Sequence, residues 1–118
     1  MTSIQKSDFL VSAKEYLEGE TVSEIRHEFI DGVVYAIAGG TQNHNKIAGN
    51  IFAELHGKLA DGCSPFISDV KVMVKTLTNE SYYYPDVVVT CDAEDTNPQY
   101  LENPTTIFEV LSESTERT

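Results

Sequence analysis

The chain has few basic residues, few cysteines and no long apolar run, and each shortage narrows the classes of protein that fit it. Its 118 residues include 8 Lys and Arg against 19 Asp and Glu, a formal net charge of −11. This balance opposes indiscriminate binding of nucleic acid, which depends on cationic contacts with phosphate. It does not exclude an enzyme that acts on phosphodiesters, since metal sites are themselves built from carboxylates.

Membrane and secretion signals are also missing from the sequence. No apolar run approaches the roughly 20 residues needed to cross a bilayer, and MTSIQKSDFL has neither a basic n-region nor a continuous apolar h-region. Cys63 and Cys91 form no C-x-x-C pair and have no histidine at zinc-site spacing. We therefore expect no membrane contact, a cytoplasmic location and two reduced, packed thiols.

The first part of the chain predicts a short helix and a hairpin. The run Ser12-Ala13-Lys14-Glu15 has the form of a capping box, so we expect a helix that continues to about Leu17 and ends at Gly19. Asp31-Gly32 lies between two apolar runs. This dipeptide favours a type I′ turn and predicts strands at about 26–30 and 33–38.

A longer amphipathic helix follows in NHNKIAGNIFAELHGKLADG. Its apolar positions recur every four residues, at Ile47, Ile51, Leu55 and Leu59. This spacing predicts a helix of about 17 residues. We expect Thr41 or Asn43 to cap its start and Asp61-Gly62 to close its end.

The rest of the chain predicts three strands, at 66–75, 82–90 and 105–112. The first two are expected to pair antiparallel through a turn near Asn79, and a polar loop from about Asp92 to Pro104 precedes the third. The polar tail SESTERT follows. This order of elements predicts an α/β or mixed α+β fold with one sheet backed by the long helix.

Two carboxylates interrupt these apolar strands. Asp86 follows Pro85 in YYYPDVVVT, and Glu109 lies in TTIFEVLS. A buried carboxylate normally changes its pKa, finds a partner or binds a metal. If the two strands are neighbours with aligned faces, the two acids converge, and they then repel unless they are protonated or bridged by a cation such as Mg²⁺ or Mn²⁺.

Two interpretations of this pair stay open. In the first, a bound cation orients a water molecule and neutralises charge that develops on a phosphate. In the second, each acid lies near a strand end and reaches solvent or a basic partner. Because Pro85 cannot donate to a strand ladder, we expect Asp86 to lie beside a bulge or an opening in the sheet.

Four stretches of the sequence, taken together, resemble the Uma2-type endonucleases that are abundant in cyanobacteria, a branch of the PD-(D/E)XK nuclease superfamily. These stretches are RHEFIDGVVYAIAGGTQNHNKIAGNI, FISDVKVMVK, YYYPDVVVT and IFEVLSESTER, in that family's order. The resemblance implies a restriction-endonuclease-like core of mostly antiparallel strands. It matches Pro85-Asp86 to the PD element and Glu109 to the second acid. It further implies that both acids hold Mg²⁺ or Mn²⁺, which activates water to hydrolyse a DNA phosphodiester.

The sequence departs from the superfamily pattern after Glu109. The usual lysine would fall two residues later, where this chain has Leu111. Uma2-like proteins supply a lysine from a helix after the SxST segment instead, and this chain ends at Thr118, before that helix and the strand that follows it. We therefore expect residues 1–118 to form one domain that is incomplete at its C-terminus. Lys71 is the candidate substitute, or else a solvated strand lysine.

Further side chains have both a functional and a structural interpretation. Glu28 and His44 match positions in the family pattern. Glu28 adds a metal ligand or is a salt-bridged strand acid, and His44 contacts a phosphate at the start of the long helix or is a cap or surface residue. The Tyr82-Tyr83-Tyr84 run stacks on bases or packs within the sheet. His27 and His56 are expected to be ordinary polar-face residues.

Two functions are therefore carried forward from the sequence. The first is a metal-dependent DNA endonuclease with Asp86 and Glu109 as ligands. The second is a catalytically inactive binding or assembly module of the same fold, which the missing lysine and the net charge of −11 favour. In a third interpretation, the metal site is purely structural. A shortened sheet would also expose an edge, which predicts a tendency to pair as a homo-oligomer.

Overall fold

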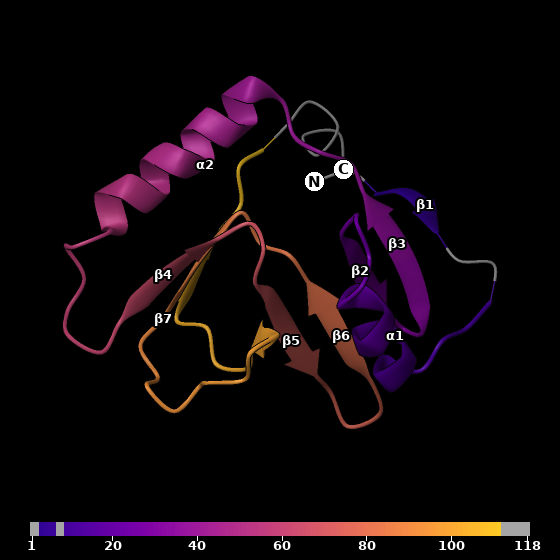
Figure 1. The fold of residues 1–118 in the computed structure, drawn as a ribbon. Helices are drawn as coiled ribbons and strands as arrows, with labels where there is room; N and C mark the ends of the chain where they lie inside the picture. The colour runs from indigo at the N-terminus through magenta and orange to yellow at the C-terminus, as the bar shows by residue number, and fades with distance from the viewer. Residues whose placement is uncertain (1–2, 7–8, 112–118) are drawn as a thin grey trace.

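The computed structural model describes residues 3–6 and 9–111, which form a mixed α+β fold with two sheets (Figure 1). The described elements are β1 (Ser3–Lys6), α1 (Ala13–Glu20), β2 (His27–Ile30), β3 (Val33–Ile37), α2 (Gln42–Leu55), β4 (Ser64–Ile67), β5 (Lys71–Lys75), β6 (Glu80–Tyr83), β7 (Val87–Thr90), β8 (Tyr100–Leu101) and β9 (Thr106–Phe108). One sheet has six strands in the order β1-β3-β2-β6-β5-β8, and the other has three in the order β4-β7-β9. Every described pairing is antiparallel except β5 with β8. The predicted fold class is confirmed.

Helix α1 begins as predicted and ends later than predicted. The Ser12 hydroxyl accepts from the Glu15 N–H, and the Glu15 carboxylate accepts from the Ser12 N–H, which completes the capping box. The helix passes through Gly19 and ends at Glu20, so the prediction that Gly19 ends it is wrong. Glycine inside a helix costs only about 1 kcal/mol, and burial of Tyr16 holds this helix on the sheet.

The predicted hairpin forms between β2 and β3. Asp31 has φ of 51° and Gly32 has φ of 80°, as a type I′ turn requires. The β2 strand then pairs on its other edge with β6, through Phe29 and Tyr82. The hairpin therefore lies at the centre of the larger sheet and carries Glu28 there.

Helix α2 is shorter than predicted and covers the smaller sheet. Thr41 caps its start, and it ends at Leu55 rather than near Asp61. Ala48 is buried, with Ile51 and Leu55 packed beside it against Val87. Figure 1 shows α2 alongside β4 and β7, away from most of the six-stranded sheet. The N-terminal end of α2 is thereby brought to the edge where β7 begins.

Two strands that the sequence predicts as continuous are each divided between the two sheets. Residues 66–75 separate into β4 and β5, with Ser68 at φ of 59° between them. Residues 82–90 separate into β6 and β7, and Tyr84–Asp86 form the crossing. The expectation that Asp86 lies at an opening of the sheet is confirmed, because strands that change sheet leave their ladder at the corner.

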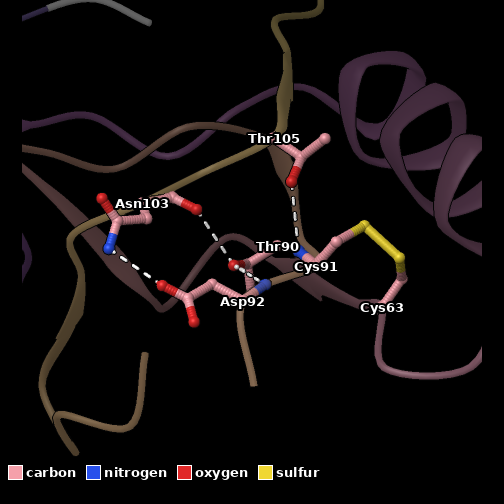
Figure 2. Close-up of a disulfide and its surroundings, with 6 residues drawn as sticks. All are labelled: Cys63, Thr90, Cys91, Asp92, Asn103 and Thr105. Carbon is pink, nitrogen blue, oxygen red and sulfur yellow. Dashed lines mark hydrogen bonds between the residues drawn. A yellow bond between two sulfur atoms is a disulfide. The ribbon is translucent and has the colours of Figure 1, made fainter. Parts of the chain in front are cut away.

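The two cysteines form a disulfide, so the prediction of reduced thiols is wrong. Ser64 pairs with Thr90 in the β4–β7 ladder, which makes Cys63 and Cys91 the next pair along it. Figure 2 shows the bond beside hydrogen bonds that attach the end of β7 to the following loop: Cys91 N–H to Thr105 Oγ1, Thr90 Oγ1 to the Asn103 carbonyl, Asp92 N–H to Thr90 Oγ1, and Asn103 Nδ2 to Asp92 Oδ2. The cysteines therefore give no support to the cytoplasmic location, which stays a prediction.

Three small clusters make up the core, and they follow the division into sheets. Tyr16 of α1 packs with Phe29 and Tyr82 in the first cluster, and Ala48 of α2 packs with Val87 and Val110 in the second. A third cluster joins the sheets through Val72, Val88 and Leu101. Neither described helix is long and apolar enough to span a membrane. The SESTERT segment lies outside the described residues.

Candidate metal-binding acid cluster

Asp86 and Glu109 meet at the edge of the three-stranded sheet. Val87 pairs with Phe108 in the β7–β9 ladder. Asp86 directly precedes β7 and Glu109 directly follows β9, so they are the next residues beyond this pair. The Asp86 N–H donates to Glu109 Oε1 at 3.2 Å, and the Val110 N–H donates to Asp86 Oδ2 at 2.7 Å. The sequence places Glu109 inside a strand, whereas β9 ends at Phe108 and Glu109 directly follows it.

The two carboxylates differ in their access to solvent. Asp86 is only 4% exposed, while Glu109 reaches the surface. Each carboxylate uses one oxygen to accept a backbone N–H. The other oxygen of each accepts no hydrogen bond from the described part of the chain, so both carboxylates retain capacity to bind a ligand.

Glu28 extends the pair into a group of three acids, here called the acid cluster (Glu28, Asp86 and Glu109). Its Oε2 accepts the Tyr84 N–H at 2.9 Å, two residues before Asp86. Burial raises the pKa of the Glu28 carboxyl, and the charge of Asp86 raises it further, against the opposing effect of the Tyr84 N–H. Three acids from β2, the β6–β7 crossing and the end of β9 therefore act on one another.

Glu109 responds to the same neighbours. Burial of its carboxyl raises the pKa of Glu109, and the charges of Asp86 and Glu28 add to the increase. Because part of Glu109 is open to solvent, screening limits the strength of these interactions. The direction of the shift shows that burial and the neighbouring acids outweigh the hydrogen bond from the Asp86 N–H, which lowers the pKa of Glu109.

His44 joins the acid cluster from the start of α2. Its Nε2 lies 3.2 Å from Asp86 Oδ2, and its side chain is only 13% exposed. The orientation does not make a hydrogen bond, so Nε2 is buried without a hydrogen-bond partner among the described residues. Gly40 leaves room for this imidazole, since a Cβ there would lie 2.8 Å from His44 Nδ1. The structure thus brings His44 to Asp86, which the sequence did not foresee.

Lys71, the candidate substitute lysine, is buried rather than solvated. It is 5% exposed, and its Nζ lies 3.5 Å from the Tyr84 hydroxyl and 5.3 Å from the centre of that ring. Burial lowers the pKa of Lys71, and the charge of Glu20 opposes this. Its described polar contacts therefore lie on the Tyr84 side of the site, and none joins it directly to Asp86 or Glu109.

Glu20 is a site residue that the sequence reasoning missed, and Tyr84 was expected only to stack on bases or to pack within the sheet. Glu20 Oε2 accepts the His27 N–H at 2.7 Å and the Tyr84 hydroxyl at 2.8 Å, and Oε1 lies 3.0 Å from His27 Nδ1. His27 is therefore part of a polar network and not an ordinary surface residue. Tyr84 lies two residues before Asp86 in the sequence, a spacing that could have identified it, whereas Glu20 carries no comparable signal.

The donor types of the site fit a hard divalent cation. Carboxylate oxygens are the preferred ligands of Mg²⁺, and an imidazole nitrogen suits Mn²⁺ as well. The orphaned Nε2 of His44 and the mutually repelling carboxylates are both groups that a cation would satisfy. In the described ranges, however, no three His, Cys, Asp or Glu side chains are already arranged around one point as metal ligands.

Comparison with known families places most of the chain in one of them. Residues 13–118 match the family model described as "Uma2: Putative restriction endonuclease". The chain belongs to the Uma2 family. The match covers every member of the acid cluster together with His44 and Lys71, and the mixed, mostly antiparallel fold is consistent with a restriction-endonuclease-like domain.

Uma2 relatives of this chain occur in Synechocystis sp. An uncharacterised protein, slr1290, is 37% identical over 108 residues, which cover 90% of this chain and 56% of that protein. A second uncharacterised protein, sll1609, is 35% identical over 109 residues, which cover 89% of this chain and 60% of that protein. The chain thus spans less than two thirds of the length of each relative. No solved structure matches it significantly.

Proposed function

We propose that this Uma2 domain is a metal-dependent endonuclease, in which Asp86 and Glu109 hold Mg²⁺ or Mn²⁺ for hydrolysis of DNA phosphodiester bonds. The observation that carries the proposal is the cross-strand meeting of these two acids at the edge of the sheet. A bound cation would lower the pKa of a water molecule and neutralise charge that develops on the phosphate. Family membership supports the same reaction class.

The protein groups have separable roles in this proposal. The backbone N–H groups of Asp86 and Val110 fix one oxygen of each ligand and leave the other oxygen of each without a hydrogen bond from the described residues. Glu28 lies on the Tyr84 side, where it adds a ligand or accepts a proton from a water molecule. Hydrolysis adds this water's oxygen to phosphorus, breaks one bond from phosphorus to a sugar oxygen, and transfers a proton to that leaving oxygen.

His44 and Lys71 are the nitrogen-bearing side chains that the proposal places around the acids. His44 lies at the N-terminal end of α2, where free backbone N–H groups favour an anion such as phosphate. Its Nε2 lies 3.2 Å from Asp86 Oδ2, beside the place where Asp86 would hold a cation. Leu111 stands where the superfamily has its lysine. Lys71, whose Nζ contacts the Tyr84 hydroxyl, is the proposed substitute for that lysine.

A non-catalytic module with the same fold is the second candidate. It is favoured by the net charge of −11. It is also favoured because the described polar contact of Lys71 is with Tyr84 and not with Asp86 or Glu109. In such a module, the three acids would either bind a metal that only stabilises the fold or bind no metal at all. It would assemble through protein contacts. Among the described strands, β9 lies at an edge of the three-stranded sheet, and an edge strand can pair with another copy.

Nicking of supercoiled DNA separates the two candidates. The chain, Asp86→Ala, Glu109→Ala and the control Glu94→Ala are compared in Mg²⁺ and in Mn²⁺, Glu94 being an exposed acid in the loop after β7. We expect Asp86→Ala and Glu109→Ala to lose at least 100-fold in rate, the usual size of an electrostatic catalytic contribution, and Glu94→Ala to match the parent chain.

Equal cleavage by all four proteins would contradict the assignment of the site. Calorimetry with Mn²⁺ near neutral pH provides the second arm of the experiment. Heat of binding that disappears in Asp86→Ala, with no cleavage by the parent chain, would favour the structural metal site. Neither binding nor cleavage would favour the inert module.

A further inference from the structure

Tyr84 is held at three separate points, more than any packing role requires. Its hydroxyl donates to Glu20 Oε2 at 2.8 Å, and its N–H donates to Glu28 Oε2 at 2.9 Å. The ring also contacts two cations, with Arg26 Cζ 5.6 Å and Lys71 Nζ 5.3 Å from its centre. Tyr84 therefore joins the buried carboxylate of α1 to a carboxylate of the acid cluster.

The chain from Tyr84 to Asp86 is stiff. Pro85 fixes its own φ near −65° and restricts Tyr84 to the extended region. All three residues are buried, with Tyr84 5% and Asp86 4% exposed. Few torsions therefore remain free between the anchored ring of Tyr84 and the carboxylate of Asp86, so a displacement at one is transmitted to the other.

We propose that Tyr84 is a positioning residue, whose bond to Glu20 sets the places of both Glu28 and Asp86. The inference rests on the proposed function, because it concerns how the same acids are held for a cation. Glu20 provides the fixed end of this chain of contacts. Its side chain is only 5% exposed and is itself held by the N–H and the ring of His27.

A neighbouring tyrosine separates positioning from ordinary stability. Tyr82 is also buried, at 1% exposed, and its hydroxyl also donates to a carboxylate, Glu80 Oε1, at 2.8 Å. Its bond lies toward the β5–β6 turn and touches no member of the acid cluster. Tyr82→Phe and Tyr84→Phe thus each remove one hydrogen bond to a carboxylate, and Tyr84→Phe also removes the longer 3.5 Å contact of the hydroxyl with Lys71 Nζ. Of the two residues, only Tyr84 is joined to Glu28 and Asp86.

The experiment compares Tyr84→Phe, Glu20→Gln and the control Tyr82→Phe in the full chain. The first readout is amide hydrogen exchange at residue 84, which reports its bond to Glu28 without any metal. We expect this exchange to accelerate about tenfold in Tyr84→Phe, less in Glu20→Gln, and not in Tyr82→Phe. Melting temperature is measured alongside, and we expect the two Tyr→Phe variants to lose similar stability, since each loses one hydrogen bond to a carboxylate.

The second readout is the Mn²⁺ concentration for half-maximal binding and nicking. Tyr84→Phe should raise it by about fivefold, as the loss of part of a charge-assisted hydrogen bond implies, with the KM for DNA unchanged and no rise in Tyr82→Phe. Equal exchange at residue 84 in the parent chain and in Tyr84→Phe would overturn the positioning role. So would equal shifts of the Mn²⁺ concentration in both tyrosine variants. If the parent chain neither binds Mn²⁺ nor nicks DNA, the proposed function fails, and the exchange comparison alone still decides the role of Tyr84.

Discussion

Glu28 links the protonation of the acid cluster to the folding of the domain. Burial and the charge of Asp86 raise the pKa of its carboxyl in the native state. The native state therefore holds this proton more tightly than the unfolded chain does. By linkage, the free energy of unfolding falls as pH rises from the ordinary glutamate range through the raised pKa, and is constant above it. Binding of a cation has the opposite dependence, because the ligands must be deprotonated.

Glu28→Gln should therefore stabilise the metal-free protein at pH 8. The amide oxygen can still accept the Tyr84 N–H, while the unfavourable charge is removed. We expect the free energy of unfolding to rise by about 1 kcal/mol or less, since Glu28 is half-buried. The gain should disappear near pH 4. Urea unfolding at both pH values measures this free energy, with Glu24→Gln, a change at an exposed residue, as the control. A gain of equal size in both variants would contradict the unfavourable charge assigned to Glu28.

Among single residues, the sequence could identify Asp86 and Glu109 but not their partners. An acid inside an apolar strand is visible as a break in a local pattern. Glu20 reaches Tyr84 across 64 positions of the chain and His44 reaches Asp86 across two elements, and no local pattern records such contacts. The disulfide was missed for the same reason, because only the β4–β7 register brings Cys63 beside Cys91.

At the scale of elements, the position of the His44 ring at the start of α2 depends on a close approach to Gly40. A side chain at residue 40 would enter the space of the His44 ring, with Cβ 2.8 Å from Nδ1. Since the imidazole is the end of a side chain, it can move aside. The helix itself can stay in place, held by Thr41 as its cap and by Ala48 in the core.

Gly40→Ala should displace His44 from Asp86 without unfolding the domain. We expect nicking to fall by at least about tenfold, because a misplacement of about 1 Å in a site can cost about 100-fold in rate. Stability should change by about 1 kcal/mol or less. Gly39→Ala is the matched control, because no atom lies within 4 Å of a Cβ there. The chemical shifts of the His44 ring measure the displacement, and an unmoved ring in Gly40→Ala would refute it.

Elements with local signals were predicted well, and elements set by distant contacts were not. The capping box, the Asp31-Gly32 turn and the Thr41 cap involve residues at most three positions apart. The division of 66–75 and 82–90 between two sheets was missed, because an apolar strand pattern continues unchanged across a corner. Strand β8 was predicted as loop, since its two residues are ordered only by their parallel pairing with β5.

At the scale of the whole molecule, a small three-stranded sheet and a larger one share little core. The disulfide joins the start of β4 to the end of β7 and closes a loop of 28 positions. Closing a loop of this length restricts the unfolded chain and is expected to contribute about 3–4 kcal/mol. For a domain of this size that is a large part of the total stability.

Reduction of the disulfide should therefore lower the melting temperature by about 10 °C or more. Thermal unfolding with and without a dithiol measures the shift. The double variant Cys63→Ser with Cys91→Ser should melt at the lower temperature in both conditions, because it has no bond to break. An identical melting temperature for the oxidised and reduced chain would show that the bond does not constrain the unfolded state.

The Cys63–Cys91 bond also turns part of the backbone into a covalent ring that contains Tyr84 and Asp86, while Glu28 and Glu109 lie on the arms outside it. Leu77 stands fully exposed at the β5–β6 turn, within the ring. A protease that cuts beside Leu77 would therefore open the ring without parting the chain. The nicked protein would migrate as one species on a denaturing gel and divide into two fragments only when the bond is reduced, so a single cut there reports the redox state of the molecule.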